Sequence, residues 1–214
     1  MKEFKWYMYR NRYSFTKEEF KLRMDYGDKI LPPYYEQNIL TWNKIAVTER
    51  SIKNIELEGV PIKGNLDKIE FDGKNVTIID YKTGKPKNSL EGQKNKFIRP
   101  TNDQPNGGDY WRQAVFYKLL IDNDPTNDWE VVGAQFDFVE PISEGEYHKE
   151  KVVITPDDIA TVTEQVKTVY QKIQEHDFNT GCGKKECDWC HFVRSNFKQA
   201  DTILELSGEE EDNQ

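Results

Sequence analysis

Residues 60–84 read VPIKGNLDKIEFDGKNVTIIDYKTG and predict a hairpin of two strands. Val60–Phe71 and Val76–Tyr81 are rich in branched and aromatic residues, which favour strands. Asp72-Gly73, between the two runs, is typical of a tight turn. A hairpin makes the two strands antiparallel neighbours, so Asp67 on the first can lie beside Asp80 on the second.

Asp80 follows the branched run Thr77-Ile78-Ile79, at the end of what we expect to be a buried strand. A carboxylate in that position loses solvation and needs a partner such as a cation. Lys82 lies two residues further on, so in extended chain it points to the same face. Two carboxylates and a lysine suit metal-assisted phosphodiester hydrolysis with Mg²⁺ or Mn²⁺. The same spacing also fits a salt-bridged hairpin without catalytic function.

Further signals predict the elements around this hairpin. Thr16 and Glu19 form a capping box that starts a helix, which we expect to end near Ile30 because Pro32-Pro33 follows. Residues 1–12 are basic and aromatic and carry no start signal. The other expected strands are Ile45–Glu49 with a continuation over Ser51–Leu57, Trp129–Val139 and Tyr147–Ile154, and the other expected helices are Tyr110–Ile121 and one beginning at Thr155-Pro156.

The last helix has an apolar stripe at helical spacing, formed by Ile159, Val162, Val166, Val169 and Ile173, which we expect to face the core. The element order is helix, three-strand meander, aperiodic loop, helix, strand pair, helix. This order predicts an α+β fold with a central mixed sheet flanked by helices, rather than a doubly wound array.

Three short motifs make a family resemblance specific. Gly64-x-x-Asp67-Lys68-Ile69-Glu70 resembles G-x-x-D-R-x-D, and Asp80-Tyr81-Lys82-Thr83-Gly84 matches D-Y-K-T-G. Both belong to the RecB-like branch of the PD-(D/E)XK nuclease superfamily, as in the C-terminal nuclease domain of RecB/AddB-type helicase–nucleases. Gln113-Ala114-Val115-Phe116-Tyr117 is similar to its third motif, Q-x-x-x-Y. The resemblance covers roughly Ile45 to Ile154 and implies that family's αβββαβ core.

The resemblance implies a set of site residues. Asp67, Asp80 and the Tyr81 carbonyl would hold the metal, and Lys82 would be the catalytic lysine. Gln113 and Tyr117 would support the site and the DNA strand. Glu49 matches an acidic position of the branch, although an exposed strand residue beside Arg50 explains it equally well.

One departure concerns the metal site. Members of the branch carry a histidine ligand in a G-T-x-x-H setting on a helix before the meander, whereas the histidines here are His148, His176 and His191. We therefore expect the chain to begin downstream of that helix and to have an incomplete metal site. On this interpretation residues 1–206 form a single nuclease domain, a C-terminal fragment of a larger helicase–nuclease, and residues 207–214 form a disordered acidic tail.

The three cysteines, Cys182, Cys187 and Cys190, lie within nine residues. They resemble the C-terminal triplet that holds an iron–sulfur cluster in AddB-like members, where a fourth cysteine comes from far upstream. A 4Fe-4S cluster in the full-length protein is therefore expected. A zinc site completed by His191 or His176, or three unligated thiols, are the alternatives.

The charge distribution bears on nucleic-acid contact. The 214-residue chain has a formal net charge of −8, which excludes a free-standing non-specific nucleic-acid coat. Residues 82–100 nevertheless carry six basic side chains against one acidic. Beside the D-Y-K-T-G motif this loop is expected to contact a DNA backbone, although a solvated loop explains it too. The basic residues beyond Lys82 are Lys85, Lys87, Lys94, Lys96 and Arg99.

Two aromatic residues at the start of the second expected helix could stack on bases. For Trp111 the helical stripe favours packing in the core, while Tyr110 stays a candidate for stacking.

No run of 18 apolar residues and no secretory signal are present, and three clustered cysteines fit a reducing compartment, so we expect a cytoplasmic protein. The function expected is metal-dependent DNA cleavage, as an exonuclease in recombination and repair, with an upstream helicase domain or a partner subunit. The alternatives are a non-cleaving module that binds DNA ends and a stand-alone exonuclease of CRISPR adaptation.

Overall fold

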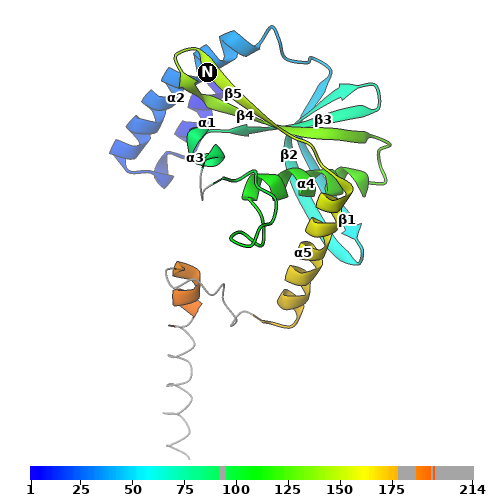
Figure 1. The fold of residues 1–214 in the computed structure, drawn as a ribbon. Helices are drawn as coiled ribbons and strands as arrows, with labels where there is room; N and C mark the ends of the chain where they lie inside the picture. The colour runs from blue at the N-terminus through cyan, green and yellow to red at the C-terminus, as the bar shows by residue number, and fades with distance from the viewer. Residues whose placement is uncertain (92–94, 178–186, 194, 196–214) are drawn as a thin grey trace, which may run out of the picture. The chain divides into compact units, whose positions relative to one another are not determined.

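The computed structural model describes residues 1–91, 95–177, 187–193 and 195. Residues 1–163 form one compact unit, in which five strands make a mixed sheet flanked by helices (Figure 1). The strands are β1 (Ala46–Leu57), β2 (Val60–Asp72), β3 (Asn75–Lys82), β4 (Glu130–Ser143) and β5 (Glu146–Val152). The helices are α1 (Lys2–Arg10), η1 (Arg12–Ser14), α2 (Lys17–Asn38), α3 (Lys87–Leu90), α4 (Asp109–Asp122) and α5 (Pro156–Gln174), which continues beyond this unit.

The strands follow one another in the order β1-β2-β3-β4-β5. β1, β2 and β3 form an antiparallel meander, β3 and β4 are parallel, and β5 returns antiparallel to β4. A parallel pair needs a crossover connection, and α4 provides it. The α+β class and the central mixed sheet flanked by helices are therefore confirmed.

The two faces of the sheet are covered by different helices. Side chains alternate along β3, so Asp80 and Lys82 point to one face and Tyr81 to the other. Gln113 of α4 bonds to Asp80 on the first face, and Tyr34 of α2 packs edge-on to the ring of Tyr81 on the second. Helices α4 and α2 consequently lie on opposite sides of the sheet (Figure 1).

Two helices precede the meander, where the sequence predicted one. Residues 2–10, which carry no start signal, form α1, and no side chain caps its first turn. A tertiary contact with α2 stabilises this helix instead. The ring of Phe4 occupies the space beside Gly27, where a Cβ on residue 27 would lie only 2.1 Å from the Phe4 Cζ. Neither α1 nor α2 contains a histidine, so neither matches the histidine-bearing helix of the branch. That the chain is a fragment stays a prediction.

The Pro32-Pro33 pair does not end α2, contrary to expectation. The capping box at Thr16 and Glu19 starts the helix as predicted, and the helix runs through both prolines to Asn38. Prolines remove backbone hydrogen bonds and crowd the preceding turn, so tertiary contacts must compensate. Tyr34, buried directly after the pair, provides them by packing against Tyr81 and Tyr147.

The hairpin turns follow the glycine signals. Glu58 and Gly59 both have positive φ, and Gly73 has φ 62°, a region that glycine adopts without strain. The buried core between the sheet and α4 contains branched and aromatic side chains from both, among them Ile69, Ile78, Val115, Leu120, Phe136 and Phe138. Trp111 is also buried, which confirms its predicted packing in the core.

Helix α5 begins as the sequence predicted. The Thr155 Oγ1 accepts from the Asp158 amide at 3.2 Å, and the Asp158 carboxylate accepts from the Thr155 amide at 2.8 Å. The expected apolar stripe is only partly buried: Val162 is buried, whereas Val169 and Ile173 are exposed. The amphipathic period therefore predicted the helix correctly but overstated how much of it is covered.

Candidate active site

Asp67 and Asp80 come together where β2 separates from β3. The β2–β3 ladder ends at the Lys68–Ile79 pair. One residue beyond Asp80 on β3, the Tyr81 amide donates to the Asp67 Oδ2 at 3.0 Å instead of to a strand partner. The carboxylate of Asp67 thus takes the place of a backbone acceptor for the Tyr81 amide. This hydrogen bond places the Asp67 carboxylate beside that of Asp80.

Asp80 is buried at the end of β3 and accepts two hydrogen bonds from α4. Its Oδ1 accepts from the Gln113 Nε2 and from the Tyr117 hydroxyl, each at 3.0 Å. Burial raises the pKa of Asp80, and the neighbouring Asp67 raises it further, while Lys82 lowers it. The pKa is raised overall, so ionised Asp80 costs free energy in the metal-free protein.

Lys82 completes the motif that the sequence predicted. Its Nζ lies 2.6 Å from the Asp80 Oδ2 and donates to the Gln113 Oε1 at 2.8 Å. The same Nζ lies over the ring of Tyr110, 4.4 Å from the ring centroid. Four of the residues predicted for catalysis, Asp80, Lys82, Gln113 and Tyr117, are therefore directly connected, and the fifth, Asp67, is joined to them through the Tyr81 amide.

The aromatic support of Lys82 was not predicted. Tyr110 stacks on Phe136 of β4 with ring centroids 5.3 Å apart and an interplanar angle of 13°. The Lys96 Nζ lies 4.7 Å from the centroid of the same Tyr110 ring. The sequence did contain a signal that Tyr110 lies near the site. Tyr110, Gln113 and Tyr117 are spaced three and four residues apart, which places their side chains on one face of a helix.

The segment between α3 and α4 is tied to the start of α4. The Lys96 carbonyl accepts from the amides of Tyr110 and Trp111 at 2.9 and 3.0 Å. This approach requires Gly108, because a Cβ there would lie 2.2 Å from the Lys96 carbonyl oxygen. The segment expected to be an aperiodic loop therefore contains α3 and an anchored stretch that shapes the site.

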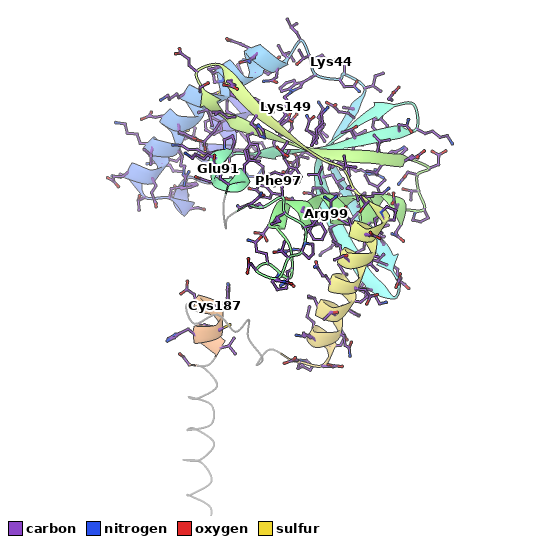
Figure 2. The ribbon with its side chains drawn as sticks, viewed as in Figure 1. Lys44, Glu91, Phe97, Arg99, Lys149 and Cys187 are labelled. Carbon is purple, nitrogen blue, oxygen red and sulfur yellow. The ribbon has the colours of Figure 1, made fainter. Side chains whose placement is uncertain are left out.

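The predicted DNA-binding residues differ in their surroundings. Lys85 and Lys87 are exposed, and Lys94 lies outside the described residues. Arg99 makes a bidentate ion pair with the buried Asp158, at 2.7 and 2.8 Å, so in this structure it joins the segment to α5 (Figure 2). Contact of these residues with DNA stays a prediction.

Glu49 lies in an irregular part of β1. It is exposed and has φ 52°, and it falls between the Thr48–Lys68 and Arg50–Leu66 pairs, opposite Asp67. In the part of the chain that the structure describes, no group of three or more His, Cys, Asp or Glu side chains is arranged to hold a metal. A role of Glu49 as a ligand stays a prediction.

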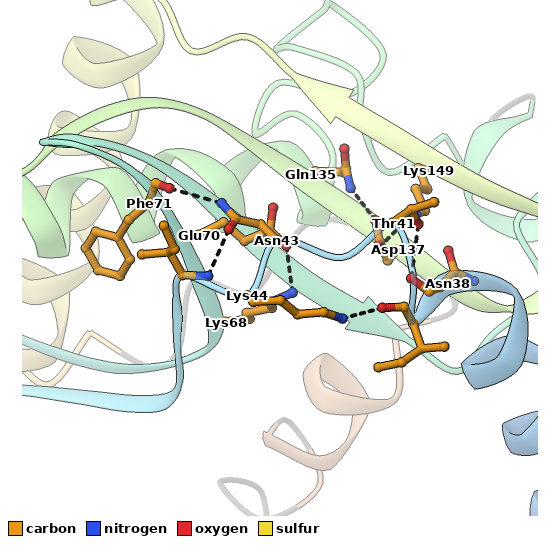
Figure 3. Close-up of polar contacts among 12 residues, drawn as sticks. Asn38, Thr41, Asn43, Lys44, Lys68, Glu70, Phe71, Gln135, Asp137 and Lys149 are labelled. Carbon is orange, nitrogen blue, oxygen red and sulfur yellow. Dashed lines mark hydrogen bonds and ion pairs between the residues drawn. The ribbon is translucent and has the colours of Figure 1, made fainter.

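A second polar cluster lies on the opposite face of the sheet (Figure 3). Buried Asp137 accepts from the Gln135 Nε2 at 2.6 Å and from the Tyr34 hydroxyl at 3.4 Å, and Lys149 lies 3.6 Å away. Burial raises the pKa of Asp137, although Lys149 opposes the effect. Sequence reasoning missed this cluster because Tyr34 and Asp137 are far apart in the chain and neither lies in a local motif.

The comparisons with known proteins agree with this architecture. The sequence profile described as the PD-(D/E)XK nuclease superfamily matches residues 8–195. The chain belongs to this superfamily. No curated protein matches this PD-(D/E)XK chain in sequence.

One solved structure shares the fold of this chain. The crystal structure of a putative exonuclease from Eubacterium rectale is 11% identical, with a TM-score of 0.52, over 88% of this chain and 67% of that chain. At this identity the likeness shows the fold alone. The crystal structure of SSO0001 is 18% identical over 87% of this chain and 78% of that chain, with a TM-score of 0.40.

The residues present suit the divalent metal ions that nucleases of this superfamily generally use. Asp67 and Asp80 offer carboxylate oxygens, which hard divalent cations prefer. The Asp80 Oδ2 is buried, and no described donor reaches it with the geometry of a hydrogen bond, although the Lys82 ammonium forms an ion pair with it. Asp67 and Asp80 are therefore the carboxylates that would hold such an ion, with Lys82 as the present partner of the Asp80 Oδ2.

The cysteine segment belongs to the second unit, residues 164–214. Cys187 is half-buried and Cys190 is buried in the helical stretch 188–193, while Cys182 lies outside the described residues, as does the predicted tail. The iron–sulfur and zinc alternatives, the latter with His191 or His176, stay predictions.

Among the described residues, none of the helices combines the length and the hydrophobicity of a membrane span.

Proposed function

We propose that this chain hydrolyses DNA phosphodiester bonds with Mg²⁺ or Mn²⁺, as the exonuclease domain of an ATP-dependent helicase–nuclease of the RecB/AddB kind. Membership of the nuclease superfamily supports the hydrolytic activity. The name of the Eubacterium rectale protein is consistent with exonuclease action. The motor, a role in recombination and repair and a 4Fe-4S cluster in the full-length protein are parts of the proposal that rest on the resemblance carried by the sequence motifs. A cytoplasmic location is a further part, which rests on the sequence lacking a secretory signal and on its clustered cysteines.

The observation that carries the proposal is the arrangement of Asp67, Asp80 and Lys82 on one face of the sheet. Asp67 and Asp80, with the Tyr81 carbonyl, would hold a divalent cation, which would supply Lewis acidity at the phosphate and neutralise its charge. Lys82, fixed by Gln113 and Tyr110, places an ammonium group where it can offset negative charge that develops on the phosphate. Because α2 offers no histidine, we expect this chain to need a higher Mg²⁺ concentration than members with that ligand.

A non-cleaving module that binds DNA ends is the second candidate, because Asp80 already pairs with Lys82. Asp67 argues against it: its Oδ2 accepts only one described hydrogen bond, from the Tyr81 amide, and no described ion pair involves it. A stand-alone exonuclease of CRISPR adaptation would share the same site.

The proposal is tested with end-labelled linear DNA in Mg²⁺, in Mn²⁺ and in EDTA, with covalently closed circular DNA as a second substrate. We expect linear DNA to be degraded only with metal, and circular DNA to persist if the chain is an exonuclease. Lys82→Met should lose roughly 100-fold in rate, whereas Lys74→Met, at an exposed surface ion pair, should not. DNA binding without cleavage in either metal would favour the end-binding module.

A further inference from the structure

Helix α1 is docked against α2 mainly through one of its faces. Phe4 packs where a Cβ at Gly27 of α2 would be, and Met8, one turn later, is half-buried. The Lys5 ammonium lies 3.0 Å from the Asp28 carboxylate at the edge of this contact. These contacts fix which side of α1 faces α2. Near the end of α1 the Tyr9 ring also packs against Phe20 of α2, with ring centroids 5.4 Å apart, while the rest of the opposite side stays exposed.

The open side carries aromatic and basic residues. The helical period places Lys2, Trp6, Tyr9 and Arg10 opposite Phe4 and Met8. Trp6 is 55% exposed and Tyr9 60%, and Tyr13 in η1 is fully exposed. These five residues, Lys2, Trp6, Tyr9, Arg10 and Tyr13, are called the α1 face below.

Charge distinguishes the α1 face from a surface that packs against protein. Residues 1–14 carry four basic side chains and one acidic, in a chain whose net charge is −8. The Arg10 guanidinium lies 5.1 Å from the centre of the Trp6 ring, so a cation stands at the middle of the aromatic patch. Aromatic residues and Arg are also enriched at protein–protein interfaces, whereas Lys is depleted there. The excess of basic side chains favours a polyanion, and single-stranded nucleic acid is bound by aromatic side chains that stack on bases beside cations that pair with phosphates.

We infer that the α1 face binds a single-stranded segment of nucleic acid, with bases stacked on Trp6 and Tyr9 and phosphates paired with Lys2 and Arg10. The inference rests on the proposed function in that a strand must reach the nuclease site. Helix α1 belongs to the same compact unit as that site. The α1 face would therefore be a strand-holding surface of the nuclease domain, separate from Asp67, Asp80 and Lys82.

The test is fluorescence anisotropy with a labelled thymidine 20-mer in EDTA, which prevents cleavage. The double variant Trp6→Ala/Tyr9→Ala should raise the Kd roughly 10-fold or more, because stacking contributes substantially for each base. Arg10→Ala should flatten the dependence of log Kd on log salt. Trp6→Phe should restore most of the affinity, and the matched control Tyr35→Ala, an exposed aromatic on α2, should leave the Kd unchanged.

Several outcomes would overturn the inference. One is that the wild-type chain shows no measurable binding of the 20-mer at low salt. Another is that the wild type and the double variant bind it with equal Kd. Concentration-dependent dimerisation that Trp6→Ala abolishes, with unchanged DNA affinity, would instead assign the α1 face to a second copy of the chain. Cleavage is read separately, with bis(p-nitrophenyl) phosphate, which is too small to reach α1. Binding without hydrolysis would leave the inference intact and refute the proposed function.

Discussion

The Lys82 ammonium lies 2.6 Å from the carboxylate of Asp80, two residues earlier on the same strand. Both side chains leave β3 on the face that α4 covers, and Gln113 contacts both, since it donates to Asp80 and accepts from Lys82. The pair therefore does not resemble a mobile surface salt bridge. Gln113 of α4 holds both charges in place, and the Lys82 ammonium also lies over the rings of Tyr110, from the same helix, and Phe136 of β4.

Tyr110 is predicted to position Lys82. Tyr110→Leu removes the ring beneath the ammonium and should lower the metal-dependent cleavage rate by about 10-fold, the size of a desolvated cation–π contact. Tyr110→Phe keeps the ring and should retain most of the rate. Single-turnover cleavage of linear DNA measures both, and equal rates for the leucine and phenylalanine variants would refute the role.

Gln113 is predicted to be the link that keeps Asp80 and Lys82 in register. Gln113→Ala removes hydrogen bonds to Asp80, Lys82 and Tyr117 at once. We expect a loss in rate of about 10-fold or more, since a hydrogen bond to a charged group contributes about 1.5–3 kcal/mol. Asp122→Ala, at an exposed position at the end of the same helix, is the control. A Gln113→Ala variant with wild-type kinetics would show that the link is dispensable.

Gly108 is predicted to be intolerant of a side chain. In Gly108→Ala the new Cβ would meet the backbone of Lys96, which cannot rotate away, so the stretch that caps α4 must shift. We expect the free energy of unfolding to fall by about 1–3 kcal/mol, as in other overpacked sites. Urea denaturation measures it, with Gly84→Ala, which has open space around its Cβ, as the control.

We predict that Asp158 makes the free energy of unfolding of this protein depend on pH in the acid range. Burial alone would raise the pKa of Asp158, but hydrogen bonds from Arg99, Thr155 and Trp111 outweigh it and lower the pKa to about 2. Because the folded pKa lies below the ordinary value of 3.8, the stabilisation is complete above about pH 4 and is lost as the pH falls toward 2.

The shift in the pKa of Asp158 from 3.8 to about 2 corresponds to about 2 kcal/mol of stabilisation of the folded state. Urea unfolding of wild type and Asp158→Asn, measured between pH 2 and pH 7, tests it. The difference between the two proteins should shrink toward the acid end. A difference that is constant over the whole range would contradict the assignment.

Much of the fold and site followed from local signals. The hairpin turns, the alternating strands and the two capping boxes lie within a few residues of the elements they define, and they predicted nearly all of the sheet. The site residues Asp67, Asp80 and Lys82 sit in or near one hairpin, so strand geometry alone places them together.

The remaining features depend on contacts between distant parts of the chain. Helix α2 continues through Pro32 because Tyr34 is buried against β3 and β5, and α1 exists because Phe4 fills the space left by Gly27. Neither contact can be recognised from the helix propensities of the neighbouring residues. The second polar cluster around Asp137 is of the same kind, since its partners come from three elements.

The most direct test of the account is the rate at which Asp80→Ala degrades linear DNA in Mg²⁺, measured beside the wild-type chain under the same conditions. Removing Asp80 takes away the proposed metal ligand and the partner of Lys82, so we expect the rate to fall by roughly 100-fold or more while the fold persists. Circular dichroism confirms the fold, and Asp72→Ala, in the exposed turn, serves as the control. A folded Asp80→Ala chain that degrades DNA at close to the wild-type rate would contradict the account.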